Sequence, residues 1–163
     1  MNQREQNLAT LKDYCARMIK GDVSALDEIM SPDWFTHASP RVIHEAFLGV
    51  TRAYEGELAF FQQVTGAFKD PELLLNKMMA IDDEHVVLNY TITGIHSEGK
   101  FFEVPPSGKR ESLHGTTILR FKDGQIVEHW GGPHCQGMRG YSSGMVGHVV
   151  DSLVDEPAVA MGE

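Results

Sequence analysis

The sequence of 163 residues contains only two cysteines, no run of basic residues and no long apolar segment. Cys15 and Cys135 lie in unrelated segments without a CxxC pair, which excludes a zinc knuckle and a thioredoxin-like site. No apolar run approaches the roughly 18 residues that a membrane span needs. The polar N-terminus has no apolar stretch behind it and shows no signal peptide. We therefore expect a soluble, cytoplasmic protein.

Acidic residues outnumber basic ones. The 23 Asp and Glu residues exceed the 14 Lys and Arg residues, which gives a formal net charge of -9. Such a surface repels phosphate backbones and disfavours nucleic-acid binding. The glycines between residues 137 and 147 lack the strand-to-helix context of a phosphate-binding loop. We expect a small hydrophobic molecule as the partner, and neither nucleic acid nor a membrane.

The N-terminal half has the periodicity of helices. A first helix is predicted from apolar residues that recur at three and four positions, namely Leu8, Leu11, Cys15 and Met18. Gly21 ends this helix, and Asp22 can cap a second, shorter one that stops at Pro32. An irregular stretch follows over 38–53. A third helix is predicted over 54–68 and is broken by Asp70-Pro71.

Beyond residue 72 the apolar period changes to two. Strands are predicted over 73–81 and 86–96, and Asp123-Gly124 lies between two strand-type runs of a hairpin. Helices followed by antiparallel strands indicate an α+β fold, with the N-terminal helices packed on one face of a curved antiparallel sheet. We expect a single domain over 1–137 and a Gly-rich extension over 138–163. Within this extension, residues 145–154 could form a short helix before a loose tail.

Several motifs resemble those of the SnoaL-like polyketide cyclases. They are Gly21-Asp22 before the second helix, Pro32-Asp33-Trp34-Phe35-Thr36-His37, Gly94-Ile95-His96, Pro105-Pro106-Ser107-Gly108-Lys109, and the run from Arg120 to Trp130. The resemblance covers about residues 5–137 and implies the cone-shaped α+β fold of the nuclear transport factor 2-like superfamily. It also implies a deep, mostly apolar pocket and acid/base chemistry without cofactor or metal, typically an intramolecular aldol ring closure on a polyketide.

The chain departs from this family at its catalytic positions. The family's general acid/base Asp corresponds to Gly131, its assisting His to Thr117 and its Gln to Gly115, whereas His129 is retained. A hairpin loop with a bulge after Gly124 pairs Phe121 with Gln125, Thr117 with His129 and Gly115 with Gly131 on one face. A two-residue type I′ turn shifts this register by one. The bulged register predicts two facing glycines that widen the pocket floor below His129.

His129 is the first candidate for a general acid/base, because an imidazole titrates near neutrality; a structural histidine is the alternative. His37, at the pocket rim, is expected to act with Thr117 in holding the oxygen on which negative charge develops. His134 is a third catalytic candidate. The predicted substrate-binding residues are Thr117, Gly115, Gly131, Tyr14, Trp34, Phe61 and Cys135. No metal is expected, because the resemblance implies none and strand alternation puts His129 and His134 on opposite faces unless the backbone bulges.

These patterns favour a cofactor-independent cyclase, isomerase or dehydratase-type lyase acting on a hydrophobic, polyketide-like biosynthetic intermediate. A non-catalytic binding protein of the same fold is the alternative, since the family's Asp is missing, and a scaffold role is a third. The outer sheet face is predicted to carry His114, Thr116, Ile118, Arg120, Ile126, Glu128 and Trp130. An apolar patch with a charged rim there predicts a homodimer or a dimer of dimers, unless residues 145–154 cover it.

Overall fold

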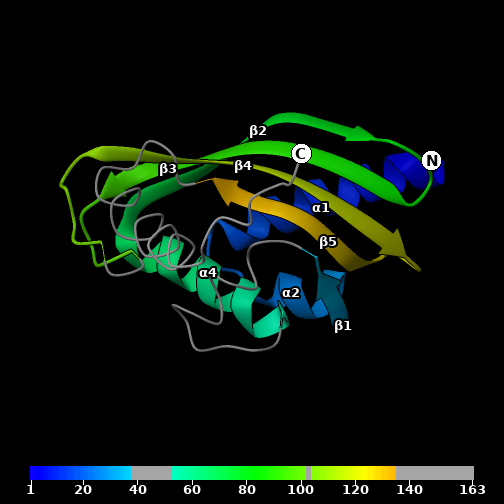
Figure 1. Ribbon diagram of the computed structural model, residues 1–163, viewed down its shortest axis with the longest axis horizontal. Coiled ribbons are helices and arrows are strands. Elements are labelled where there is room, and N and C mark those ends of the chain that lie inside the picture. The colour runs from blue at the N-terminus through cyan, green and yellow to red at the C-terminus, as the bar shows by residue number, and fades with distance from the viewer. Residues whose placement is uncertain (38–52, 102–103, 135–163) are drawn as a thin grey trace, which may run out of the picture.

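The computed structural model describes residues 1–37, 53–101 and 104–134. Helices α1, α2 and α4 lie below the concave side of a five-stranded curved sheet (Figure 1). The elements are α1 (Gln3–Met18), α2 (Ser24–Ile29), β1 (Met30–Thr36), α4 (Ala53–Ala67), β2 (Phe68–Ala80), β3 (His85–His96), β4 (Arg110–Lys122) and β5 (Gln125–His134). The strand order is β1-β5-β4-β3-β2. The predicted α+β fold is confirmed, with one addition: β1 runs parallel to β5.

The first helix begins at a capping box. The Asn2 side chain accepts a hydrogen bond from the Glu5 backbone N–H, and the Glu5 carboxylate accepts one from the Asn2 backbone N–H, which satisfies two N-terminal donors. The predicted cap of α2 is wrong, because Val23 occupies the N-cap position. Asp22 instead accepts hydrogen bonds from the backbone N–H and the hydroxyl of Ser24.

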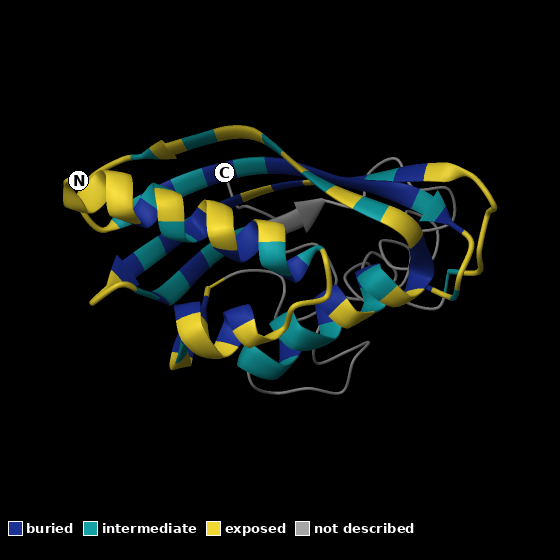
Figure 2. Cartoon of the chain, turned by 180° about the vertical axis from the view of Figure 1, so that it is seen from behind, coloured by how far each residue is buried: buried dark blue, intermediate teal, exposed yellow. Residues whose placement is uncertain are grey.

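The hydrophobic core lies between the helices and the concave face of the sheet. Figure 2 shows buried residues on the helix faces that point toward the sheet, while exposed residues cover the opposite helix faces. The fully buried apolar side chains include Leu11, Met18, Leu26, Val64, Ile92, Phe101, Leu113, Phe121 and Ile126. The helix and strand periodicities of the sequence therefore meet in one core.

Both prolines that were predicted to break elements lie within edge strands. Pro32 is part of β1 and Pro71 is part of β2, the two outermost strands of the sheet. An edge strand tolerates proline because the missing N–H can face away from the ladder. In β2 the register shifts between Lys69 and Glu72, and Asp70 has a φ of 51°. The strand thus begins at Phe68 rather than after the Asp70-Pro71 pair.

The β4–β5 hairpin closes with a two-residue turn. Lys122 pairs with Gln125, and the intervening Asp123 and Gly124 have φ angles of 51° and 81°. Positive φ at both central residues defines a type I′ turn. The predicted pairing of Phe121 with Gln125 is wrong, because the expected bulge is not in the turn itself.

The bulge lies further along β5. Phe121 pairs with Ile126 and Arg120 with Glu128, so the register shifts there and Val127 is the extra residue. An extra residue reverses the alternation of the side chains that follow it. Ile126 precedes the bulge and pairs with the core residue Phe121 because of the two-residue turn, so it is fully buried and does not lie on the predicted outer face.

The bulge also sets the partners of the candidate site residues. His129 pairs with Leu119 and Thr117 with Gly131, so the predicted pairs Thr117–His129 and Gly115–Gly131 are wrong. His129 and Thr117 are nevertheless both buried, as expected for the inner face. The inner face of these two residues was therefore predicted correctly, although the predicted β4–β5 register was wrong.

The predicted widened floor of facing glycines is also wrong. Gly131 has a φ of +89°, and a Cβ there would lie 2.2 Å from the Thr116 carbonyl oxygen. A Cβ on Gly115 would lie 2.2 Å from the ring of Tyr90, which therefore fills the space. Gly131 is required by the backbone, whereas Gly115 makes room for an aromatic ring.

We predict that Gly131→Ala lowers the free energy of unfolding by about 3 kcal/mol, because left-handed strain is joined by a backbone clash. Gly108→Ala is the matched control, since Gly108 has a φ of +68° but no atom lies within 4 Å of the place that a methyl group would take. The control should cost only about 1 kcal/mol. Urea unfolding at one pH measures both. Equal losses in the two variants would contradict the assigned role of Gly131.

Candidate functional site

The parallel pairing of β1 with β5 places three hydrogen-bonding side chains together on the concave face. Thr36 pairs with His129 across the two strands, and the Thr36 hydroxyl lies 3.5 Å from His129 Nδ1. The His129 and Trp34 rings have their centroids 5.5 Å apart at an interplanar angle of 34°. All three residues are buried. An imidazole is thus held between a hydroxyl and an indole.

The indole N–H of Trp34 is the unusual member of this group. Trp34 is only 4% exposed, yet its Nε1 has no hydrogen-bond partner among the described residues. Leaving a buried donor unpaired costs on the order of 1–3 kcal/mol, and buried tryptophan N–H groups usually find an acceptor. A donor of this kind beside His129 is suited to a ligand oxygen.

Thr117 and Tyr90 continue the concave face toward β3. The Thr117 hydroxyl donates to the Trp130 carbonyl oxygen at 2.9 Å, so its proton is already engaged within the sheet. Tyr90 pairs with Gly115 and is buried. The family resemblance implies a Gln at the position of Gly115. The Tyr90 ring covers this position instead.

A carboxyl group and a phenol meet between α1 and α4. The Tyr14 hydroxyl donates to Glu57 Oε1 at 2.9 Å, and the Tyr14 ring packs edge-on against Phe61 with centroids 6.2 Å apart. Tyr14 and Phe61 are buried and Glu57 is partly buried. Two of the predicted substrate-binding residues thus lie together, and Tyr14 is bonded to Glu57, a residue that was not among the predicted site residues.

Burial changes the acidity of this cluster. It raises the pKa of Glu57 from 4.5 to about 7, and the Tyr14 hydrogen bond counters only part of that rise. Burial and then the Glu57 charge raise the pKa of Tyr14 well above its usual value. The same two causes raise the pKa of Cys15 to about 12, which keeps that thiol protonated and unreactive. Glu57 can therefore exchange a proton near neutral pH.

Glu57 could have been found from its spacing. It follows Tyr54 by three residues and precedes Phe61 by four, so it shares the helix face of those aromatic residues. An acidic residue on an otherwise apolar helix face is unusual unless it has a partner. The raised pKa, in contrast, depends on packing against α1 and could not be read from the sequence.

His37 lies on the opposite side of the sheet from His129. Its ring stacks on Trp130 with centroids 4.6 Å apart and an interplanar angle of 1°, and it meets Phe35 edge-on at 4.8 Å. His37 and Phe35 are exposed. The prediction that His37 lies at the pocket rim beside Thr117 is wrong, because alternation along β1 puts Trp34 and Thr36 inside and Phe35 and His37 outside.

The described part of the structure does not bring His134 and Cys135, two other predicted site residues, to the site at His129. His134 pairs with His114 through the backbone of β4 and β5, and Cys135 falls outside the described residues. His114 is exposed and its Nδ1 lies 3.0 Å from the Thr91 hydroxyl. Over 1–37, 53–101 and 104–134, no group of three His, Cys, Asp or Glu side chains is arranged to hold a metal ion.

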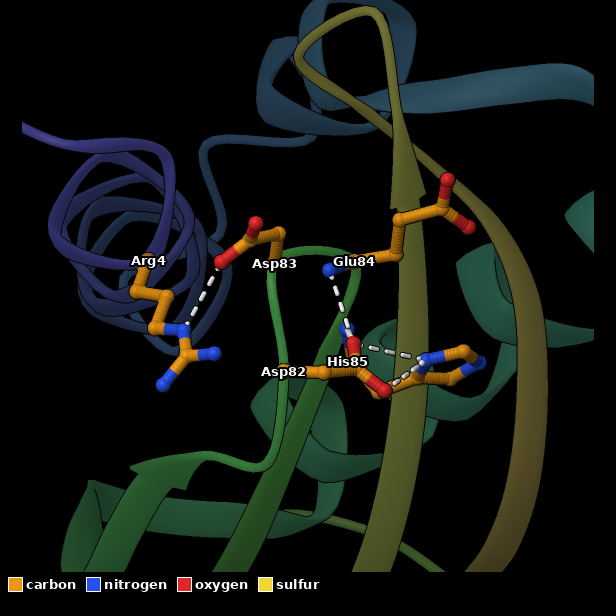
Figure 3. A pocket seen from close by; sticks show the side chains of 5 residues that line it. All are labelled: Arg4, Asp82, Asp83, Glu84 and His85. Carbon is orange, nitrogen blue, oxygen red and sulfur yellow. Dashed lines mark hydrogen bonds and ion pairs between the residues drawn. The ribbon is translucent and has the colours of Figure 1, made fainter.

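A shallow depression of about 260 Å³ opens at the β2–β3 turn, lined by Arg4, Asp82, Asp83, Glu84 and His85 (Figure 3). Its interactions are those of a capped turn. The Asp82 carboxylate accepts hydrogen bonds from the backbone N–H groups of Glu84 and His85, which lowers its pKa to about 2. Arg4 pairs with Asp83 at 2.8 Å. The groups here serve the turn, and the His85 ring lies 6.0 Å from the Trp130 ring at the outer face of the sheet.

Comparisons with known proteins agree on one family. The family model of SnoaL-like polyketide cyclases matches residues 9–138. The fold is similar to that of AclR, a candidate hydroxylase from Streptomyces galilaeus, with 28% identity over 79% of this chain and 81% of that one and a TM-score of 0.61. It is also similar to IdmH, a candidate polyketide cyclase from Streptomyces antibioticus, with 25% identity, coverage of 78% and 91%, and a TM-score of 0.62.

TsrD from Streptomyces laurentii shares the fold at 21% identity, with coverage of 83% and 93% and a TM-score of 0.67. The sequence has no match among curated proteins. Of the helices that the structure describes, none is long and apolar enough to span a membrane.

We predict that Glu57→Gln removes a pH-dependent part of the stability. A carboxyl whose pKa is raised on folding binds its proton more tightly in the folded state, so its contribution is full below about pH 4.5 and falls as the pH rises to about 7. The free energy of unfolding of the wild type, relative to the variant, should drop by on the order of 2–3 kcal/mol between pH 4 and pH 8. Urea unfolding at both pH values measures this. A difference that does not change with pH would contradict the buried environment of Glu57.

Proposed function

This protein belongs to the family of SnoaL-like polyketide cyclases, and we propose that it catalyses proton transfer during ring closure of a hydrophobic, polyketide-like intermediate without a cofactor. The reaction is of the aldol type, in which a carbon next to a carbonyl group attacks a second carbonyl of the same chain. The missing family Asp, at Gly131, requires that other side chains supply the acid and the base.

His129 is the proposed base. It lies on the concave face, is buried, and has its Nδ1 near the Thr36 hydroxyl. A neutral imidazole can take the proton from the carbon that becomes the nucleophile and give it up afterwards. Thr36 orients the ring in this arrangement.

The observation that carries the proposal is the Trp34 indole N–H, which has no hydrogen-bond partner within the described parts of the chain. The Trp34 ring lies beside the His129 ring. Loss of a proton from carbon places negative charge on the neighbouring carbonyl oxygen. A buried donor that is already in place stabilises this charge without reorganisation. Trp34 takes the part that the sequence analysis gave to His37.

The same pair of groups bears on the alternative of a non-catalytic binding protein. The Trp34 N–H could hold the oxygen of a bound metabolite with no reaction. Binding of an oxygen needs only the donor, whereas enolate formation uses both the donor and an imidazole that can take a proton. The distinction is whether the protein accelerates loss of a proton from carbon.

We predict that the wild type accelerates the loss of deuterium from α-tetralone labelled next to its carbonyl group. This ketone is a flat, apolar molecule whose exchange needs only a base and an oxygen-binding donor. His129→Asn should lower the enzymatic rate by about 10²- to 10⁴-fold. Trp34→Phe keeps the ring and removes the donor, and should cost about 10²-fold. Mass spectrometry follows the label.

Glu98→Gln, an exposed carboxylate in the β3–β4 connection, is the control and should match the wild type. A wild type that binds α-tetralone but exchanges no deuterium would establish the binding alternative. Full exchange in His129→Asn would show that another residue is the base.

We also propose a homodimer, or a dimer of dimers, formed through the outer face at the β1–β5 edge. Phe35 is 52% exposed, and the stacked pair of His37 and Trp130 continues the same surface. The ion pair between Arg120 and Glu128, at 2.8 Å, borders it. An aromatic centre with a charged border is typical of an interface. The apolar centre of this interface was predicted to contain Trp130, Ile118 and Ile126. Ile126 is not part of it, since it is in the core.

The expected result of Phe35→Glu or Trp130→Glu is dissociation into monomers of 18.1 kDa, because either change buries a charge in the aromatic centre. Val23→Glu, an exposed apolar position between α1 and α2, should leave the assembly intact. Light scattering at micromolar concentration gives the masses. A monomeric wild type rejects the interface.

A further inference from the structure

Glu57 combines partial burial with a single hydrogen bond to its carboxyl group. One oxygen, Oε1, accepts the Tyr14 hydroxyl hydrogen bond. No hydrogen bond or ion pair of Oε2 is formed with any residue over the described parts of the chain, and no cationic side chain among them faces the group. A partly buried carboxyl held at one oxygen by a phenol, with the other oxygen available, has the geometry of a proton donor or acceptor for a ligand.

The surroundings of Glu57 belong to the concave interior. Tyr14 and Cys15 on α1 are the ionisable groups whose pKa values its charge affects, and Tyr90 on β3 acts on Tyr14 in turn. Tyr90 covers Gly115 on β4, two residues before Thr117. Because α4 also packs against β1, the strand that carries Trp34 and Thr36, Glu57 lies on the same side of the sheet as His129, on a helix rather than on a strand.

We propose that Glu57 is the second catalytic group of the reaction, the acid that protonates the carbonyl oxygen attacked during ring closure, and that Tyr14 is its positioning residue. This inference rests on the proposed function. It assigns the chemistry of the missing carboxylate at Gly131 to a carboxyl group on α4, and it makes the substrate an intermediate with two carbonyl groups.

The protons balance as follows. His129 takes a proton from the nucleophilic carbon, and that carbon forms a bond to the second carbonyl carbon. The π electrons of this carbonyl move to its oxygen, which takes the proton of Glu57 and becomes a hydroxyl group. Glu57 is left as a carboxylate that still accepts the Tyr14 hydrogen bond. Transfer of a proton from the His129 imidazolium to Glu57 through water restores both groups.

The reverse reaction provides a test with a known compound. The β-hydroxy ketone 4-hydroxy-4-(6-methoxy-2-naphthyl)-2-butanone cleaves to acetone and a fluorescent aldehyde. By microscopic reversibility, cleavage needs the Glu57 carboxylate as base at the hydroxyl group. The wild-type rate should therefore rise as the pH passes through about 7, where Glu57 ionises, in contrast to deuterium loss from α-tetralone, which has no such hydroxyl group.

Glu57→Gln should lower the cleavage rate by about 10²-fold and abolish the rise near pH 7, with a much smaller effect on deuterium loss from α-tetralone. Tyr14→Phe should keep the rise but move it to higher pH, because the lost hydrogen bond favours the ionised carboxyl. Glu55→Gln, on the same helix, is the matched control and should keep the wild-type profile. Far-UV circular dichroism and urea unfolding show that each variant is folded.

The two proposals fail in different ways. If Glu57→Gln retains the wild-type cleavage rate and pH profile, the role of Glu57 is overturned while that of His129 stands. If the wild type accelerates neither cleavage nor deuterium loss, the proposed function falls and the role of Glu57 falls with it. If Glu57→Gln lowers both reactions equally and without a change of profile, its effect is structural and the inference is also overturned.

Discussion

The side of the sheet on which His129 lies depends on one extra residue in β5. The type I′ turn at Asp123-Gly124 alone would continue a regular ladder, and His129 would then point to the outer face. The bulge at Val127 reverses the alternation of the residues that follow it, so that His129 joins the concave face. Parallel pairing with β1 then brings Thr36 and Trp34 beside His129. The turn, the bulge and the edge strand together position one imidazole.

The concave face departs from the rules of a well-paired core at two places. Trp34 buries a donor without an acceptor among the described residues, and Glu57 buries part of a carboxyl group whose partner is a neutral phenol. Each departure reduces stability, and natural proteins concentrate such departures at functional sites. The two lie on different elements, Trp34 on β1 and Glu57 on α4.

The outer face is organised differently. Toward its centre it carries a hydrogen-bonded set of polar side chains, in which Asn76 donates to Thr91 and Asn89 donates to Thr116. The aromatic cluster of Phe35, His37 and Trp130 lies only at the β1–β5 edge. The outer face is thus polar toward its centre and aromatic at the β1–β5 edge, and it also carries the exposed apolar side chains of Leu74 and Met79 on β2.

The sequence by itself determined the features that depend on neighbours along the chain. The helix over 3–18, the hairpin turn, the alternation of β3 and the family motifs follow from local spacing and turn chemistry. The presence of His129 and Thr117 on the inner face was also predicted.

Only the tertiary structure decided the rest. The bulge at Val127, the filling of Gly115 by Tyr90, the outward position of His37 and the raised pKa of Glu57 each depend on a residue far away in the sequence. A one-residue change of register exchanges the two faces of a strand without altering its composition. The acidity of a carboxyl group likewise depends on how much water packing removes, which no local pattern records.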